Sequence, residues 1–209
     1  MLQKNNWDII RGDMLSVIPT FDDKTFDAII TDPPYSSGGA TLNAKQQSTA
    51  KKYTSTKAEC PIPDFEGDAK DQRSWTTWMA EWLSIARQKC KPGAPVCPLT
   101  DWRQLPSLTD ALQWAGWHWR GILSWDKTNA RPQRGRFRQQ AEFIVWGSNG
   151  NMPATRPAPV LPGAFRYASP TASKRNHMTE KPLELMREIV KICEPGGTIL
   201  DPFAGSGTT

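Results

Sequence analysis

The apolar run Phe26-Asp27-Ala28-Ile29-Ile30 stops at Thr31-Asp32-Pro33-Pro34-Tyr35, and this junction constrains the fold more than any other stretch. A short β-prone run that ends at two prolines is typical of a buried strand followed by a rigid loop. Proline has no N–H, so the carbonyls of Asp32 and Pro33 are left free to accept hydrogen bonds. A carboxylate, free carbonyls and the Tyr35 ring can accept both hydrogens of an exocyclic amino group and stack on the attached heterocycle. Taken alone, the tetrapeptide is equally compatible with an ordinary loop.

A second apolar strand, Gly197-Thr198-Ile199-Leu200, runs into Asp201-Pro202-Phe203-Ala204-Gly205-Ser206-Gly207-Thr208-Thr209. Glycines at alternate positions let the backbone approach a ligand closely, and a helix that follows such a turn points its N-terminus at that ligand. A plain glycine-rich turn is the alternative for this stretch on its own.

Together, the Asp32–Tyr35 tetrapeptide and the Asp201–Thr209 stretch resemble the amino-group DNA methyltransferases, which use S-adenosylmethionine to methylate adenine N6 or cytosine N4. The order, with the catalytic tetrapeptide first and the cofactor loop last, is that of the family's β class. The resemblance covers both ends of the chain well and the middle loosely. It implies an α/β, Rossmann-like methyltransferase fold: an open, mostly parallel sheet with helices on both faces, circularly permuted so that the catalytic half precedes the cofactor half.

The resemblance also implies roles for particular residues. The catalytic residues it implies are Asp32, Pro33, Pro34 and Tyr35. The S-adenosylmethionine contacts it implies are Asp13, Thr179, Lys181, Asp201, Phe203, Gly205, Ser206, Gly207 and Thr208. Asp13 follows a predicted strand, Trp7–Ile10, and capping of a helix that begins at Met14 is an open alternative for it. Thr179 and Lys181 lie in a His-x-x-x-Lys-Pro stretch like the one that lines the methionine end of the cofactor in the family, although an ordinary capped amphipathic helix explains them equally.

Adenine N6 is favoured over cytosine N4 as the methylated atom, because the family's N4 members more often carry serine before Pro-Pro. Double-stranded DNA is favoured over RNA. The alternatives are a cytosine N4 methylase of the same family and a catalytically inactive nucleic-acid-binding remnant. A Rossmann dinucleotide enzyme is disfavoured, because no G-x-G-x-x-G follows the first strand. The implied transfer requires neither a cysteine nucleophile nor a metal.

The region Lys127–Arg138 carries five cations and no acidic residue, with one aromatic residue among them. Such a stretch is suited to phosphate contacts, and a solvated surface is the alternative. Residues 36–71 lack periodicity, and we expect a mobile loop there that closes over a flipped nucleotide. The predicted DNA contacts are Lys51, Lys52, Lys127, Arg131, Arg134, Arg136 and Arg138.

Composition agrees with an intracellular protein that meets a polyanion. Lysine and arginine number 26 against 21 acidic residues, a net charge of +5. The four cysteines show no C-x-x-C spacing and there are two histidines, so we expect free thiols and no zinc site. No signal peptide or apolar run of ~20 residues is present. We therefore expect a cytoplasmic monomer or homodimer without a membrane span, in a bacterial cell or a phage-infected host.

The chain is predicted to form a single methyltransferase domain over residues 1–209. Its parts are a catalytic strand region (1–35), the mobile loop (36–71), catalytic-half helices and strands (72–146), a short, proline-rich target-recognition arm (147–175) and the start of the cofactor-binding half (176–209). The tryptophans of a helix over Ser74–Lys89 are predicted to be core. Because the family continues past its glycine loop with a helix, a strand and an acidic residue on the cofactor ribose, we expect the chain to be truncated there.

Overall fold

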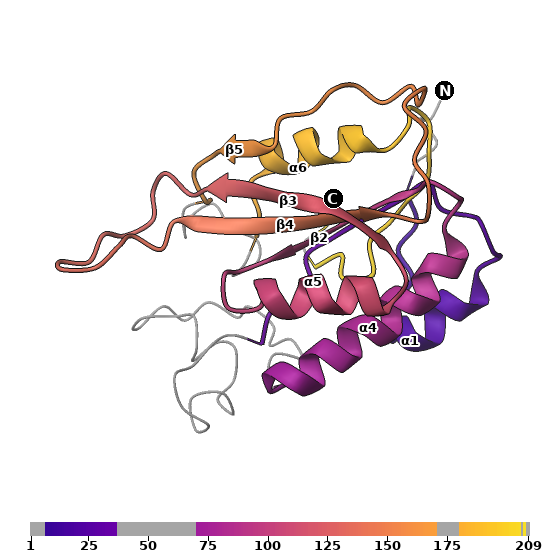
Figure 1. The fold of residues 1–209 in the computed structure, drawn as a ribbon, viewed down its shortest axis with the longest axis horizontal. Helices are drawn as coiled ribbons and strands as arrows, with labels where there is room; N and C mark the ends of the chain where they lie inside the picture. The colour runs from indigo at the N-terminus through magenta and orange to yellow at the C-terminus, as the bar shows by residue number, and fades with distance from the viewer. Residues whose placement is uncertain (1–6, 37–69, 171–179, 206, 208–209) are drawn as a thin grey trace.

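The computed structural model describes residues 7–36, 70–170, 180–205 and 207, and its centre is a six-stranded sheet (Figure 1). The strand order is β5-β3-β4-β2-β1-β6. The strands are β1 (Ala28–Thr31), β2 (Pro95–Thr100), β3 (His118–Asp126), β4 (Ala141–Ser148), β5 (Ala164–Arg166) and β6 (Ile199–Leu200). The predicted strands that end at Asp32 and at Asp201 are therefore neighbours in space.

The sheet is mostly parallel, as expected, with β4 as its one antiparallel strand among the described residues. The pairs β1–β2, β1–β6 and β3–β5 are parallel, whereas β4 is antiparallel to both β2 and β3. The chain returns from β3 to β4 through a hairpin, and a hairpin joins antiparallel strands. Because β1, β2, β3 and β6 share one direction, their carboxyl ends lie along a single edge of the sheet, which we call the carboxyl edge.

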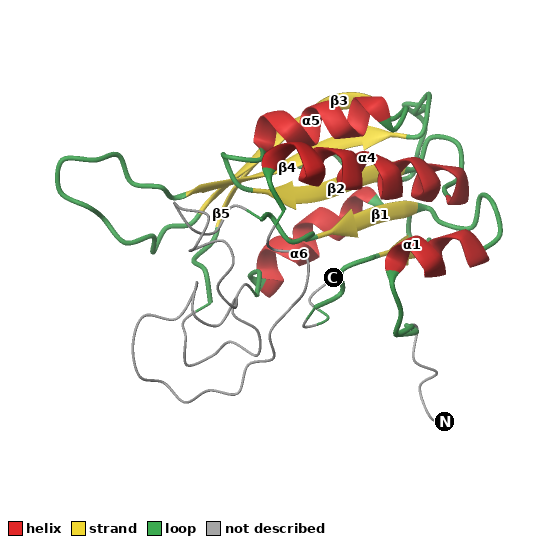
Figure 2. Ribbon diagram, turned by 90° about the horizontal axis from the view of Figure 1, so that it is seen from below, coloured by secondary structure: helices red, strands yellow, loops and turns green. Residues whose placement is uncertain are grey.

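Helices cover both faces of the sheet, as expected (Figures 1 and 2). On one face lie α1 (Met14–Val17), η1 (Ile18–Thr20), α4 (Gln72–Lys89) and α5 (Leu105–Trp114), and on the other lie α6 (Leu183–Ile189) and η3 (Val190–Ile192). Successive side chains of a strand point to opposite faces. In β1, Ile29 joins the core under α4, whereas Ala28 and Ile30 join the core under α6. Strand β1 is therefore buried on both sides, which fixes the position of the loop that follows it.

Helix α4 confirms the prediction of core tryptophans for Trp75 and Trp82, whereas Trp78 is half-buried and packs against that core. Asp71 caps its N-terminus by accepting bonds from the backbone N–H groups of Arg73 and Ser74, at 2.9 and 3.0 Å. Trp75 and Trp82 are fully buried. After the helix the chain turns at Gly93, whose φ of +81° favours glycine. No helix among residues 7–36, 70–170 and 180–205 is long and apolar enough to cross a membrane.

The predicted strand over Trp7–Ile10 is wrong. These residues form no strand, and Trp7, Ile9 and Ile10 are 64, 73 and 58% exposed. The sequence has local strand propensity, but a strand needs a partner to receive its backbone hydrogen bonds. Among the described residues, none pairs with this segment.

The arm predicted over residues 147–175 is only partly a loop. Its first two residues complete β4, and Ala164–Arg166 forms β5, which pairs with the end of β3. Phe165 is buried in the core under α6. The neighbouring prolines obscure this short strand in the sequence. Residues 171–175 of the arm, and residues 37–69 of the predicted mobile loop, lie outside the described residues.

Candidate active site

The loop Asp32–Tyr35 lies at the carboxyl edge of the sheet, and two helices hold its backbone. The indole N–H of Trp75, on α4, donates to the Pro34 carbonyl at 2.7 Å. The side-chain amide of Gln104, which caps α5, donates to the Tyr35 carbonyl at 2.9 Å. In the described part of the chain no residue donates a hydrogen bond to the carbonyl of Pro33, a buried residue. The loop is therefore fixed on either side of an acceptor that has no donor among the described residues.

The side chains of this loop join a cluster of charges drawn from three other segments, which we call the charge network: Asp32, Tyr35, Lys127, Glu142 and Lys181. Asp32 accepts from the Tyr35 hydroxyl through Oδ1 at 2.7 Å and from Lys181 Nζ through Oδ2 at 2.5 Å. Both oxygens of the predicted catalytic carboxylate are thus engaged. Lys181 Nζ also lies 5.1 Å from the centre of the Tyr35 ring, a cation–π contact.

Glu142 is the second carboxylate of the charge network and faces both of its lysines. Its Oε1 accepts from Lys127 Nζ at 3.0 Å, and its Oε2 lies 3.7 Å from Lys181 Nζ and 3.4 Å from the Tyr35 hydroxyl. The lysines face the carboxylates so that each ion has a partner of opposite sign. This arrangement is needed because a buried charge without a partner is strongly destabilising.

Burial and neighbouring charges together shift the pKa values of Lys181, Glu142 and Tyr35. Burial opposes the charge of Lys181, but Asp32 and Glu142 outweigh it and raise the pKa of Lys181. Burial also opposes the charge of Glu142, but Lys181 and Lys127 outweigh it and lower the pKa of Glu142. Burial and the neighbouring carboxylates raise the pKa of Tyr35 well above its usual range. At neutral pH Lys181 and Glu142 are therefore charged and Tyr35 is neutral.

The second predicted loop begins beside the first. Asp201 accepts through Oδ1 from the Thr31 hydroxyl at 2.5 Å and from the Phe203 backbone N–H at 3.0 Å, which ties the end of β6 to the end of β1. Gly205 and Gly207 follow with φ of +52° and +74°, a region that favours glycine. Both are exposed, and a Cβ added at Gly207 would meet no atom within 4 Å. The glycines thus allow the backbone to turn with positive φ, and open space lies beside Gly207.

These features fit a cofactor bound between the two loops. A turn of positive φ at the carboxyl end of β6 presents backbone to a ligand, and β1 places Asp32 beside that ligand. Phe203 has a further structural part, because its ring packs against Trp78 and Trp82 with centroids 5.4 and 5.5 Å away. Of the other residues predicted to contact the cofactor, Thr179, Ser206 and Thr208 lie outside the described residues.

Asp13 caps α1, with its Oδ1 accepting from the Leu15 N–H at 2.9 Å. The capping alternative for this residue is therefore observed, and its contact with a cofactor stays a prediction. Lys181 contacts Asp32, and its contact with the cofactor also stays a prediction.

The predicted DNA contacts that the structure describes differ in their surroundings: four arginines are exposed, whereas Lys127 is paired with a carboxylate. Arg131, Arg134, Arg136 and Arg138 are all exposed on the β3–β4 hairpin. Lys127 is different, because its ammonium is paired with Glu142 at the base of that hairpin. Lys51 and Lys52 lie outside the described residues.

Sequence reasoning missed three residues of the site. The indole of Trp75 and the amide of Gln104 hold the loop, and Glu142 completes the charge network. The signal for Glu142 was present, since it is a carboxylate inside the otherwise apolar strand β4. Trp75 carried no such signal, because its helical spacing already explained it as core.

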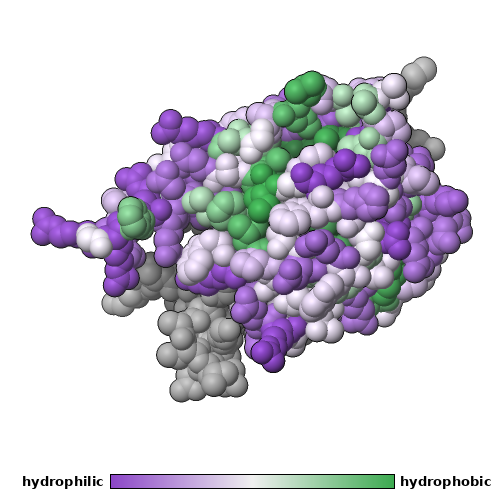
Figure 3. Space-filling model, viewed as in Figure 1, coloured by the Kyte–Doolittle hydropathy of each residue, from purple (hydrophilic) through white to green (hydrophobic). Residues whose placement is uncertain are grey.

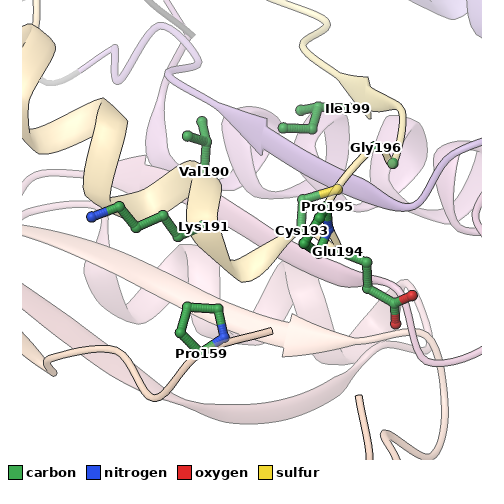
Figure 4. Close-up of a pocket in the computed structure, with 9 residues that line it drawn as sticks. Pro159, Val190, Lys191, Cys193, Glu194, Pro195, Gly196 and Ile199 are labelled. Atoms are coloured by element: carbon green, nitrogen blue, oxygen red, sulfur yellow. The ribbon is translucent and has the colours of Figure 1, made fainter. Parts of the chain in front are cut away.

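A shallow hollow of about 460 Å³ lies elsewhere, beside η3 and the turn before β6 (Figure 4). It is lined by Pro159, Cys193 and Glu194, among others. Gly196 and Gly197, which also line it, precede β6, whereas Asp201 follows it. The hollow is therefore at the opposite end of β6 from the charge network and takes no part in the site.

Comparison with known proteins places this geometry in a family. A family model described as DNA methylase matches residues 26–209. The chain belongs to the DNA methylase family. The match to this DNA methylase spans both the loop after β1 and the loop after β6.

Individual relatives agree with this membership. The chain is 26% identical to the type II methyltransferase M2.MboI of Moraxella bovis, over 98% of the chain and 77% of that protein. Its fold is similar to the M1.HpyAVI–SAM complex, with a TM-score of 0.61 at 22% identity over 95% of this chain and 82% of that one. It is also similar to the cytosine-N4-specific PvuII DNA methyltransferase, with a TM-score of 0.66 at 15% identity over 95 and 74% of the two chains. The structural matches establish that this DNA methylase shares their fold.

Proposed function

We propose that this DNA methylase transfers a methyl group from S-adenosylmethionine to the exocyclic amino group of a base flipped out of double-stranded DNA, with adenine N6 as the favoured target. The observation that carries the proposal is the position of Asp32 and the free Pro33 carbonyl at the carboxyl edge, directly beside the Asp201 loop. The M1.HpyAVI–SAM complex, whose fold is similar, supports the choice of cofactor. S-adenosylmethionine supplies an electrophilic methyl group on a sulfonium centre.

The chemical difficulty lies in the amino group. Its lone pair is delocalised into the base, so the nitrogen is a poor nucleophile. Asp32 and the Pro33 carbonyl can accept its two hydrogens, which favours a pyramidal nitrogen with its lone pair directed at the methyl group. Positioning of this kind, with stabilisation of the positive charge that develops on nitrogen, lowers the barrier without a covalent intermediate.

The charge network gives Asp32 a defined resting state. Its oxygens are held by Tyr35 and Lys181, so an incoming amino group takes over at least one of these bonds. Glu142 already lies 3.7 Å from Lys181 Nζ and can hold the ammonium when Asp32 turns to the base. Tyr35 then keeps its ring available to stack on the base, a contact worth roughly 1–3 kcal/mol. A base inside a duplex cannot reach these groups, so the proposal requires flipping.

Adenine is favoured because Asp32 stands before Pro-Pro, where N4-cytosine members of the resembled family more often carry serine. The fold does not decide the base, since the cytosine-N4-specific PvuII enzyme is among the similar structures. The four exposed arginines of the β3–β4 hairpin support a DNA substrate, because they can neutralise backbone phosphates.

Mass spectrometry of nucleosides tests this proposal. Unmethylated DNA is incubated with the protein and S-adenosylmethionine, digested to nucleosides and analysed. We expect N6-methyladenine, and N4-methylcytosine would keep the reaction and correct the base. Absence of both, with DNA binding intact, would favour the inactive nucleic-acid-binding alternative.

A further inference from the structure

The connection between β3 and β4 is a long arginine-rich hairpin, residues 127–140, which we call the basic hairpin. It projects away from the carboxyl edge of the sheet (Figures 1 and 2). Its base is fixed: the Lys127 N–H donates to the Gln140 carbonyl at 2.7 Å, and the Gln140 amide donates to Asp126 Oδ1 at 2.8 Å. Asn129 adds two bonds to the backbone of Ser169, at 2.8 and 2.9 Å. The hairpin is therefore anchored where it leaves the sheet.

The outer part of the basic hairpin is free of the protein body. Residues 131–139 are all exposed, and the chain reverses near Gly135, whose φ is +71°. Figure 3 shows the projection as mainly hydrophilic with a small hydrophobic spot on it. Phe137, between Arg136 and Arg138, is 98% exposed. A single exposed apolar residue is ordinary, but this one stands on an anchored hairpin among cations that no described acidic residue pairs with.

We propose that Phe137 is a wedge that inserts between stacked base pairs of the DNA duplex next to the flipped base, while Arg134, Arg136 and Arg138 bind the flanking phosphates. The inference rests on the proposed function, which supplies the flipped base. Extruding a base unstacks its neighbours, and apolar side chains inserted between base steps occupy such gaps in other DNA-binding proteins. The flanking arginines hold the ring against the polyanion by neutralising phosphates.

The fold connects this wedge to the site. The basic hairpin leaves the same carboxyl edge as the Asp32–Tyr35 loop, because β3 runs in the direction of β1. Lys127 at its base is paired with Glu142 of the charge network at 3.0 Å. Seven residues from Lys127 to Arg134 reach up to about 23 Å when extended, which exceeds the roughly 12 Å width of the major groove. The hairpin can therefore enter a duplex while its base stays at the active site.

The first test uses DNA unwinding, which does not depend on methylation. A closed circular plasmid is relaxed by a topoisomerase in the presence of saturating protein, and its linking number is then measured. The wild-type chain is expected to shift the linking number, as an inserted ring unwinds the duplex. Phe137→Ala should lose this shift, Phe137→Trp should keep it, and Val160→Ala, which alters another fully exposed apolar side chain, should leave it unchanged. An equal shift for wild type and Phe137→Ala would overturn the wedge.

The second test uses the methylation rate on duplexes that carry a sequence the wild-type protein methylates. Phe137→Ala should slow methylation of the paired target by about tenfold, in line with the loss of one stacked ring. Opposite an abasic site the target is already unpaired, so the difference from wild type should shrink to about twofold or less. The same defect on both duplexes would contradict insertion. Failure of the proposed function has a different outcome, in which the wild-type protein methylates neither duplex.

Arg134→Ala separates charge from insertion. Loss of one phosphate contact should reduce the dependence of DNA affinity on salt by about one unit of the logarithmic slope, whereas Phe137→Ala should leave that slope unchanged. A change of slope in Phe137→Ala would show that its effect comes from displaced arginines and not from the ring.

Discussion

Lys181 Nζ lies 2.5 Å from Asp32 Oδ2, although the two residues are 149 positions apart in the sequence. The contact joins the loop after β1 to the residues that lead into α6, on the other face of the sheet from α4. Only 8% of the Lys181 side chain is exposed, so its ammonium depends on Asp32 and Glu142 for compensation. The carboxylate to which we assign the amino hydrogens is therefore positioned by a buried cation.

Replacing Lys181 by methionine should slow methyl transfer by about 10²-fold, the scale expected when a reacting group is misplaced. Lys181→Arg retains the charge and should restore most of the rate. A methionine variant with a wild-type rate would show that Lys181 does not position Asp32.

Glu142→Gln should lower the free energy of unfolding by about 3 kcal/mol at neutral pH, because it removes one of the two carboxylates that face the buried Lys181 and takes away the partner of Lys127. The pKa of Glu142 is lowered in the folded protein, so its ionic contribution is present above the ordinary value of 4.5 and is lost as pH falls through the lowered value. Urea unfolding of both proteins from pH 7 to pH 3 should therefore show the two stabilities converging at acid pH. A difference that is constant over this range would exclude the charge of Glu142 as its cause.

Substitutions at Tyr35 separate its ring from its hydroxyl. Tyr35→Phe keeps the ring and loses the 2.7 Å bond to Asp32. Its methylation rate should fall by less than about tenfold, which corresponds to the loss of one hydrogen bond. Tyr35→Trp should retain activity. Tyr35→Ala loses the stacking contact, so its methylation rate should fall by roughly tenfold or more. Equal single-turnover rates for the alanine and tryptophan variants would remove stacking from the mechanism.

Trp75→Phe removes the N–H that holds the Pro34 carbonyl and leaves that carbonyl without its partner. The free energy of unfolding should therefore fall by about 1–3 kcal/mol, and the methylation rate should fall as well. Trp82→Phe is the matched control. Trp82 is equally buried on the same helix, but its indole N–H donates to Met79 Sδ at 3.2 Å and not to the loop. Thermal unfolding should show losses for both variants, whereas the rate should fall only in Trp75→Phe. Equal rates in the two variants would mean that the indole bond does not position the loop.

The local parts of this fold could be predicted because each carries its pattern within a few residues. The apolar runs before Asp32 and Asp201 became β1 and β6, and the tryptophan spacing of α4 became core. The segment Trp7–Ile10 shows the limit of this reasoning. It has the residues of a strand, but strand formation also requires a partner, which local sequence does not reveal.

The charge network could not be predicted in the same way. Its bonds join Asp32 to Lys181 across 149 positions and Tyr35 to Glu142 across 107, so they depend on how the sheet brings four segments together. Sequence resemblance assigned Lys181 to the cofactor, and it gave no sign of the bond between the Lys181 ammonium and Asp32. Ionic contacts of this kind follow from topology and burial rather than from spacing.

The most direct measurement is the single-turnover methylation rate of Asp32→Ala and Asp32→Asn, with methylated nucleosides quantified by mass spectrometry and DNA affinity measured in parallel. Loss of the carboxylate should reduce the rate by about 10²–10³-fold, the scale of removing one group that stabilises developing charge. DNA affinity should stay within a few-fold of wild type, because the role proposed for Asp32 is to contact the reacting amino group and not the phosphates. A rate within tenfold of wild type in both variants would contradict the role assigned to Asp32 and, with it, the proposed mechanism.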